Sequence, residues 1–322
     1  MGAVKEYVLR HYRHFNAAAI VEAAEAWAQH LEHGGKMFLS MGGAMSTAEI
    51  GTVLADLIRH GKVHALCVTG ANLEEDLFNL VAHRHCRRVP NYRELSPLED
   101  RQLLEEGYNR VTDTCIPELE AMRAVESRVI ELWRAAESRG ERLPPHQHLY
   151  TLLRRGGLAS RYQIDPKDSW MLAAAEADLP LFVPGWEDSS LGNFLVAMVV
   201  QGKLEGYGSV QSGLEQMQRL VEWYEREQVD HGIGFFQIGG GISGDFPICV
   251  VPLITQDLKR KVRTWSYFCQ ISEATTSYGS YSGAPPSEKI TWGKLDLDTP
   301  RFVIESDATV VFPLIAAYLL DS

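Results

Sequence analysis

A lysine stands close to an acid and an aromatic residue near the C-terminal end of the chain. Glu288, Trp292 and Lys294 close the segment 277–294, which is otherwise rich in glycine, serine, proline and tyrosine. An aromatic face beside a carboxylate suits an alkylammonium ion, through cation–π and ionic attraction, and long irregular loops are often functional. A lysine in such a pocket can lose its proton and form an imine. By residue type alone, however, Lys294 is more typical of a solvated surface lysine.

A short glycine loop follows the first expected strand, at residues 36–40. Gly42 and Gly43 would let the backbone approach a phosphate, and a helix start beyond them would supply free N–H groups. Ser46, with Glu49 three residues later, predicts a capping box that opens this helix. The loop lacks the spacing of GxGxxG, so it fits either a nucleotide site or a plain tight turn.

Residues 239–241 are three consecutive glycines after another buried strand, expected at residues 233–238. Three glycines carry an entropic cost that a plain turn does not require. We therefore favour close approach of the backbone to a ligand over a flexible turn.

Three acids follow the apolar segment 63–69, where an expected strand meets a helix. Glu74, Glu75 and Asp76 can complement the positive end of the helix dipole. Open α/β sheets also bind ligands at the carboxyl ends of their parallel strands, where a carboxylate could accept hydrogen bonds from ribose hydroxyls. Both interpretations stay open from the sequence.

Apolar segments that suit buried strands alternate with helical patterns along most of the chain. The segments 36–40 and 63–69 flank an amphipathic helix, which makes a βαβ unit. Further strands are expected at 181–184, 233–238, 265–271 and 302–305, and further helices at 16–32, 73–81, after 191, at 249–258 and from 308. This alternation predicts an α/β, Rossmann-like fold with a mostly parallel sheet and helices on both faces. Residues 95–165 are predicted to be helical and carry no recognisable motif.

The composition is that of an ordinary globular protein. The 322 residues, 45% of them apolar, can bury a large core, and no repeat or linker divides them. We expect one domain over residues 1–322, with 1–35 as an N-terminal helical segment packed on it. The net charge of −11 disfavours nucleic-acid and membrane partners and attracts a cationic substrate.

Cysteine usage and hydropathy predict the cytoplasm. The five cysteines form no CxxC pair, and no apolar segment is long enough for a membrane span. His83, His85 and Cys86 suggest a metal site, but they lie among arginines and no second ligand cluster exists, so we expect no metal.

Six motifs occur in the order and approximate spacing found in deoxyhypusine synthases: FLSMGGAMST, VTGANLEEDL, WEDSSLGN, FFQIGGG, SGAPPSEKITWGK and ESDATVVFPL. They extend from Met37 to the C-terminus. The combination of SGAxPxE with WGK is highly specific, and the chain resembles the shorter, bacterial-type deoxyhypusine synthase-like branch.

This resemblance implies an NAD-dependent transferase. In the family, NAD takes a hydride from spermidine beside its secondary amine, and the lysine of WGK captures the resulting imine with loss of 1,3-diaminopropane. The aminobutyl group then passes to an acceptor amine, and NADH returns the hydride. The resemblance also implies a homotetramer of paired dimers with sites at dimer interfaces.

The match assigns expected roles to individual residues. Lys294 is implied as the nucleophile, and Glu288 and Trp292 as lining of the polyamine channel. The residues implied at or near NAD are Gly43, Ser46, Thr47, Thr69, Glu74, Glu75, Asp188, Gly240, Gly241 and Asp307.

Three departures from the family pattern bear on the substrate. Asn193 replaces the second acid of the family's DGSLGD, Tyr281 replaces an acid before SGA, and Asp245 replaces a histidine after the triple glycine. We count all three as substrate-binding candidates. We expect the lysine chemistry to persist and the amine substrates to differ.

Several functions therefore stay open. The acceptor amine could be a protein lysine, or a small amine such as putrescine, as in a homospermidine synthase-like enzyme. A non-catalytic NAD or polyamine sensor is a further alternative, although a binding protein has no need of an imine-forming Lys294. A simple NAD dehydrogenase would differ by releasing NADH.

Overall fold

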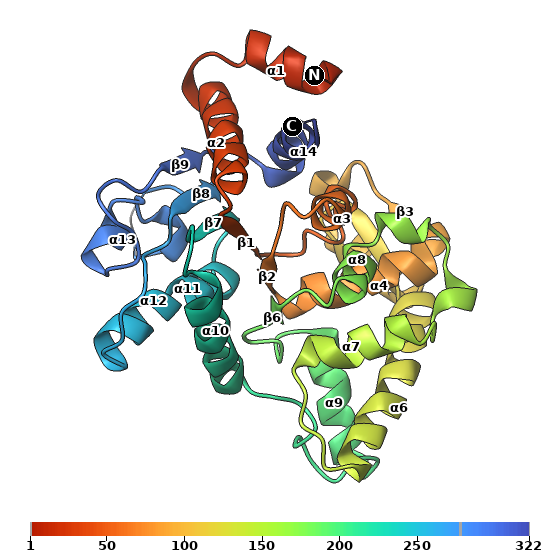
Figure 1. Cartoon of the computed structure of the whole chain (residues 1–322). Helices are drawn as coiled ribbons and strands as arrows, with labels where there is room; N and C mark the ends of the chain where they lie inside the picture. Colours follow the sequence, from red (N-terminus) through yellow and green to blue (C-terminus); the bar gives the residue numbers. More distant parts are fainter. Residues whose placement is uncertain (1, 277–278, 322) are drawn as a thin grey trace.

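The computed structural model describes residues 2–276 and 279–321 and is built around a six-stranded parallel sheet (Figure 1). Ser277, the first residue of the segment 277–294, lies outside the described residues. The sheet has the order β6-β2-β1-β7-β8-β9, and every pair of neighbours is parallel. The strands are β1 Lys36–Met41, β2 Ala65–Val68, β6 Leu181–Phe182, β7 Ile233–Ile238, β8 Tyr267–Ile271 and β9 Arg301–Ile304.

This order is that of a doubly wound sheet, in which the chain starts at the centre and builds outward in both directions. The reversal falls between β1 and β7, so the loops after these two strands meet at the switch point. The predicted fold class is confirmed, and every expected strand is present with slightly different bounds.

Alternate residues of the central strands face two separate cores. Leu39 of β1 and Phe236 of β7 belong to one core, whereas their neighbours Phe38 and Phe235 belong to the other. Both strand faces are therefore covered, which explains why these segments are almost wholly apolar. The helices are α1 Ala3–His11, α2 Phe15–Glu32, α3 Gly51–Arg59, α4 Gly70–Ala82, α5 Pro97–Glu105, α6 Ala124–Ser138, α7 Pro145–Arg154, α8 Trp170–Glu176, α9 Ser190–Val200, α10 Gly213–Glu227, α11 Ile242–Ile248, α12 Val250–Pro252, α13 Glu288–Thr291 and α14 Ala308–Leu320.

The first core holds α2, α3, α4, α8 and α14, and the second holds α10 and α11, with α13 at its edge. Three aromatic rings stack across neighbouring strands in the second core. The rings of Phe38 and Phe235 are 5.6 Å apart, and those of Phe235 and Phe268 are 6.1 Å apart. This aromatic layer lies beneath the cavity described below, because Phe268 contacts Lys289 there.

The N-terminal helices lie beside the C-terminal one, and α1 and α2 both pack against α14 (Figure 1). Helix α2 also packs against the edge strand β9. Among the described helices, none is long and apolar enough to cross a membrane.

The middle of the chain departs from the prediction. Helices α5, α6 and α7 are present, but a three-stranded antiparallel sheet lies among them, formed by β3 Arg87–Arg88, β4 Tyr108–Val111 and β5 Thr114–Pro117. The strands have only two to four residues each, too few to show the alternation of apolar residues that would identify them in the sequence.

The predicted capping box at Ser46 is wrong. Residues 44–50 form turns, and α3 begins only at Gly51. The Ser46 hydroxyl donates to the backbone carbonyl of Asn72 at 2.8 Å, and its N–H donates to the Asn72 side chain at 2.9 Å. Glu49 instead lies 2.9 Å from the His83 ring. The polar groups of Ser46 therefore bind Asn72 in the first turn of α4, and they do not cap α3.

Candidate active site

Lys294 is positioned by a tight turn after α13. Gly293 has a φ of 69°, in the left-handed region that favours glycine, and it ends the helix. The N–H of Lys294 then donates to the Lys289 carbonyl at 3.0 Å, and the Lys294 carbonyl accepts from Trp265 at 3.1 Å. The backbone of the lysine is thus held between α13 and the segment that leads into β8.

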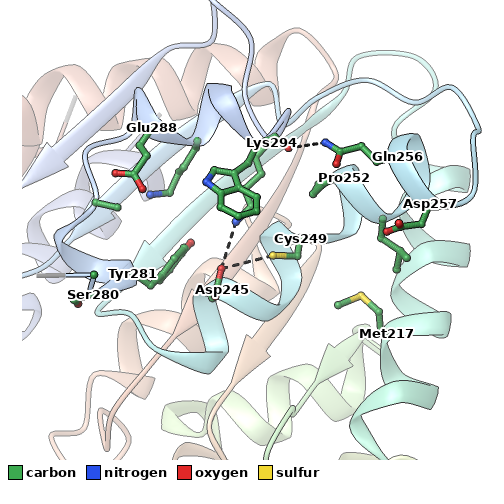
Figure 2. Close-up of a pocket in the computed structure, with 15 residues that line it drawn as sticks. Met217, Asp245, Cys249, Pro252, Gln256, Asp257, Ser280, Tyr281, Glu288 and Lys294 are labelled. Carbon is green, nitrogen blue, oxygen red and sulfur yellow. Dashed lines mark hydrogen bonds and ion pairs between the residues drawn. The ribbon is translucent and has the colours of Figure 1, made fainter. Parts of the chain in front are cut away.

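The side chain of Lys294 forms an ion pair inside a cavity (Figure 2). Its Nζ lies 3.3 Å from Asp245 Oδ1, and its side chain is only 8% exposed. Asp245 belongs to α11, directly after the triple glycine, and its carboxylate also accepts from Cys249 Sγ at 3.6 Å. Asp245 thus holds the Lys294 amine in place, and only the neutral form of a lysine amine can act as a nucleophile.

Aromatic rings flank the same ammonium group. Lys294 Nζ lies 5.8 Å from the ring centroid of Tyr281 and 5.6 Å from that of Trp292. The Tyr281 hydroxyl donates to Gln237 Oε1 at 2.7 Å, and burial raises the pKa of this phenol well above its usual value. Tyr281 therefore stays neutral and offers a ring face and a fixed hydroxyl.

Tyr281 can occupy this position only because α11 has a glycine against it. A Cβ on Gly244 would lie 2.8 Å from a ring carbon of Tyr281 and 2.7 Å from Gln237 Oε1. Nothing in the local sequence signals this requirement, because the three residues come from separate elements.

The cavity has a volume of about 590 Å³. The predicted residues Asp245, Tyr281, Glu288, Trp292 and Lys294 all line it. The structure thus brings the nucleophile candidate together with four of the five substrate-binding candidates. Sequence analysis missed further residues of the lining, among them Met217, Cys249, Gln256, Asp257 and Lys289.

Lys289 is the most unusual of the missed residues. It is 3% exposed, and its Nζ has no hydrogen-bond partner among the described residues. The Nζ lies 4.9 Å from the ring centroids of both Phe268 and Tyr281. Burial, together with the nearby charge of Lys294, lowers the pKa of Lys289 to about 8. The sequence gives no signal for this, because a lysine beside a glutamate is normally solvated.

A fifth candidate, Asn193, lies elsewhere. It is exposed on α9 and borders a different cavity of about 420 Å³, which shares no lining residue with the cavity of Lys294. Within one chain, Asn193 and Lys294 are therefore not brought together.

The residues implied at NAD surround the carboxyl edge of the sheet. The Thr69 hydroxyl donates to the Gly43 carbonyl at 2.7 Å, which joins the loops after β1 and β2. Asn72, which sequence analysis missed, is fully buried and donates to the carbonyls of Met41, Gly42 and Gly43 at 3.0–3.1 Å. The side chains of Asn72 and Thr69 together therefore hold the glycine loop in place.

The glycine loops at the switch point contact each other. A Cβ on Gly42 would lie 2.8 Å from the Gly240 carbonyl, and one on Gly240 would overlap the Ser282 side chain. The chain itself thus requires glycine at these two positions. Gly241 differs, because its φ is 67° and a Cβ there would meet nothing within 4 Å.

The paired acids after β2 bind backbone groups. Glu74 accepts from the N–H groups of Ser190 and Leu191 at 2.9 and 2.8 Å, which caps the start of α9. Glu75 accepts from the Thr47 N–H at 3.2 Å, and burial raises the pKa of Glu75 to about 7. Glu74 thus positions the start of α9, Glu75 positions the loop that contains Thr47, and a role of either acid at ribose stays a prediction.

The remaining cofactor candidates are spread along the same edge. Asp188 is exposed before α9, and Asp307 is exposed at the start of α14, where it accepts from the Thr309 N–H at 2.8 Å. Thr47 and Asp307 border one further cavity of about 610 Å³. Ser46 is buried and borders a different cavity.

A doubly wound sheet with glycine loops at its switch point and a buried lysine in an aromatic, acidic cavity defines a Rossmann-type protein with a lysine-centred site. The sequence model of the family described as "Deoxyhypusine synthase" matches residues 8–319. The chain therefore belongs to the deoxyhypusine synthase family, as its motifs predicted. Membership supports an enzyme that transfers an aminobutyl group.

Curated relatives are similar over almost the whole chain. A "Deoxyhypusine synthase-like protein" of Cyanothece sp. is 26% identical over 99% of this chain and 79% of its own length. "Probable deoxyhypusine synthase 2" of Archaeoglobus fulgidus is 26% identical over 95% of this chain and 94% of its own length. A crystal structure assigned as a deoxyhypusine synthase from Entamoeba histolytica covers 97% of this chain and 91% of its own, with a TM-score of 0.58 and 13% identity, which supports the fold alone.

Proposed function

We propose that the chain is an NAD-dependent transferase that moves an aminobutyl group from a polyamine such as spermidine to an acceptor amine, through an imine on Lys294. The observation that carries this proposal is the burial of the Lys294 amine in a cavity with an acid and two aromatic walls. Such a cavity suits both an alkylammonium ligand and imine chemistry.

The edge of the sheet suits a dinucleotide. The space beside Gly241 is open, and the cavity between Thr47 and Asp307 lies at the N-terminal end of α14, where the helix dipole favours a phosphate. The residues that would hold NAD are Gly43, Ser46, Thr47, Thr69, Glu74, Glu75, Asp188, Gly240, Gly241 and Asp307. When bound, NAD would accept a hydride from the carbon beside the donor's secondary amine and return it after transfer.

The protein residues then have separate tasks. Lys294 gives up its proton and attacks the donor carbon, and the bond from that carbon to the leaving amine breaks. Asp245 can pair with the Lys294 ammonium or with a substrate ammonium, but not fully with both. Trp292 and Tyr281 shield the reacting carbon from water, and Glu288 attracts the ammonium end of the chain.

The acceptor is proposed to be a small amine or a protein lysine. A homospermidine synthase-like enzyme is favoured by Tyr281 and Asp245, which line the cavity and differ from the family pattern. We further propose a cytoplasmic homotetramer made of paired dimers. A site shared between two chains would allow Asn193 to reach the amine substrate of a neighbour.

The proposal is tested by trapping the imine. The protein is incubated with NAD and spermidine, putrescine, homospermidine or agmatine, reduced with borohydride, and mapped by mass spectrometry. An NAD-dependent aminobutyl mass on Lys294 is expected with at least one amine. Lys294→Arg should abolish the adduct, whereas Lys261→Arg, at an exposed position, should leave it unchanged. Binding of NAD and amines with no adduct from any amine would favour the non-catalytic alternative.

A further inference from the structure

Lys289 is a buried cation that lacks an anion. It lines the same cavity as Lys294, is 3% exposed, and has no ion-pair or hydrogen-bond partner for its Nζ among the described residues. Two aromatic rings surround the group but supply no full negative charge. An unpaired ammonium in such a place has lost its hydration without gaining an ion pair, so an anion that enters with a ligand would be strongly favoured.

The other charges of the cavity define what this ligand must carry. Lys294 and Asp245 form an ion pair and largely cancel each other. Glu288 and Asp257 also line the cavity, and neither has a cationic partner among the residues that the structure describes. One cation and two anions are therefore left for a ligand to match.

We propose that the acceptor amine is a diamino acid and that its α-carboxylate binds Lys289. This inference rests on the proposed function, because the acceptor must reach the aminobutyl group on Lys294. One of the two free acids would bind the α-ammonium of the acceptor, and the other would bind the terminal ammonium of the aminobutyl group. The charges of the cavity and of its two ligands then match.

The transfer step balances with this arrangement. The neutral side-chain amine of the diamino acid attacks the imine carbon on Lys294, and a carbon–nitrogen bond forms. The bond from this carbon to Lys294 Nζ breaks, and the lysine leaves as an amine after taking up the proton from the acceptor nitrogen. The new imine is reduced by the hydride that was removed from the donor.

Two ligands that differ only in the carboxylate test the inference. Ornithine and putrescine have the same carbon chain between their amines, so calorimetric titration of both isolates the contribution of the carboxylate. We expect ornithine to bind at least about tenfold more tightly, as one charge-assisted interaction would give. Lys289→Met should reduce the affinity for ornithine to that for putrescine or below it, and Lys289→Arg should retain the preference.

Controls separate this contact from general effects. Lys261→Met removes an exposed positive charge and should leave the ratio of the two affinities unchanged. Ornithine amide, which lacks the carboxylate, should bind the unmodified protein as weakly as putrescine does. This second measurement needs no variant, so it stands even if Lys289→Met does not fold.

Three results would overturn the inference: no binding of ornithine, putrescine binding as tightly as ornithine, or a preference for ornithine that survives in Lys289→Met. Failure of the proposed transferase function is visible separately, as the absence of a Lys294 adduct. A carboxylate preference that depends on Lys289, without any adduct, would support the binding site and reject the transfer.

Discussion

Lys289 and Lys294 line one cavity but differ in their neighbours. Lys294 has the carboxylate of Asp245 at 3.3 Å, whereas Lys289 has only the rings of Phe268 and Tyr281 nearby. Aromatic rings compensate for lost hydration much less than a carboxylate does, so burial lowers the pKa of Lys289. The two residues are of the same type, and their surroundings decide which has an anion beside it in this chain.

Because of its lowered pKa, Lys289 should make the free energy of unfolding depend on pH. Below about pH 8 the lysine is charged in both folded and unfolded chains, so the full penalty of burial applies. Between about pH 8 and 10.5 the unfolded chain holds the proton more strongly, so the stability of the unmodified protein rises with pH. The free energy of unfolding of Lys289→Met should therefore exceed that of the unmodified protein by roughly 3 kcal/mol at pH 7. This difference should shrink toward pH 10.

Urea unfolding of both proteins at the two pH values measures this difference. Lys261→Met serves as the control, because its exposed ammonium should contribute almost equally at both pH values. A difference for Lys289→Met that does not change with pH would show that Lys289 does not titrate in this range.

Helix α11 connects the glycine loop of the switch point to the cavity. It begins after Gly241, carries Asp245 toward Lys294, and leaves space for Tyr281 at Gly244. The predicted cofactor loop and the predicted amine site are thus two ends of one short element. Small displacements of α11 should affect both.

Gly244→Ala should disturb the amine site. The added methyl group would overlap Tyr281 and Gln237, and such overpacking typically lowers stability by about 1–3 kcal/mol. We expect less Lys294 adduct and a lower melting temperature. Gly206→Ala is the matched control, because a Cβ there meets nothing within 4 Å. Equal adduct yields in the two variants would contradict a requirement for glycine at Gly244.

Glu74→Ala tests the link between α4 and α9. Its carboxylate accepts two backbone N–H groups at the start of α9, and removal would leave partly buried donors unpaired. We expect a loss of about 1–3 kcal/mol in the free energy of unfolding and weaker NAD binding, measured by urea unfolding and titration calorimetry. Glu131→Ala, at an exposed position on α6, is the control and should change neither quantity. If Glu74→Ala also left the free energy of unfolding unchanged, the capping role of Glu74 would be rejected.

The separation of Asn193 from Lys294 within one chain bears on the oligomeric state of the protein. Asn193 and Lys294 border separate cavities of one chain, although both are implied at the amine site. Two chains that contribute to one site would resolve this separation, as the expected tetramer of paired dimers provides.

Light scattering of the purified protein measures the assembly directly. A particle of four times the chain mass of 36.1 kDa is expected. If adjacent chains share the site, Asn193→Ala and Lys294→Arg should each lose the adduct alone, and mixed particles of the two variants should recover part of it. A single-chain mass together with full adduct formation would exclude a shared site.

The sequence by itself determined the sheet and the centre of the candidate site. Apolar segments such as Ile233–Ile238 are typical of strands covered on both faces, and their alternation with helical patterns indicated a parallel sheet and so the fold class. Glu288, Trp292 and Lys294 lie in one short segment, so their proximity did not depend on tertiary structure.

Only the tertiary structure decided which distant residues join them and which do not. Asp245 and Tyr281 reach Lys294 from other elements, Asn193 does not, and Lys289 is buried by packing against β8. Local patterns report the periodicity of one element, whereas these contacts depend on how elements pack against each other. For the same reason the capping-box prediction at Ser46 was wrong, because Asn72 in the first turn of α4 binds its polar groups.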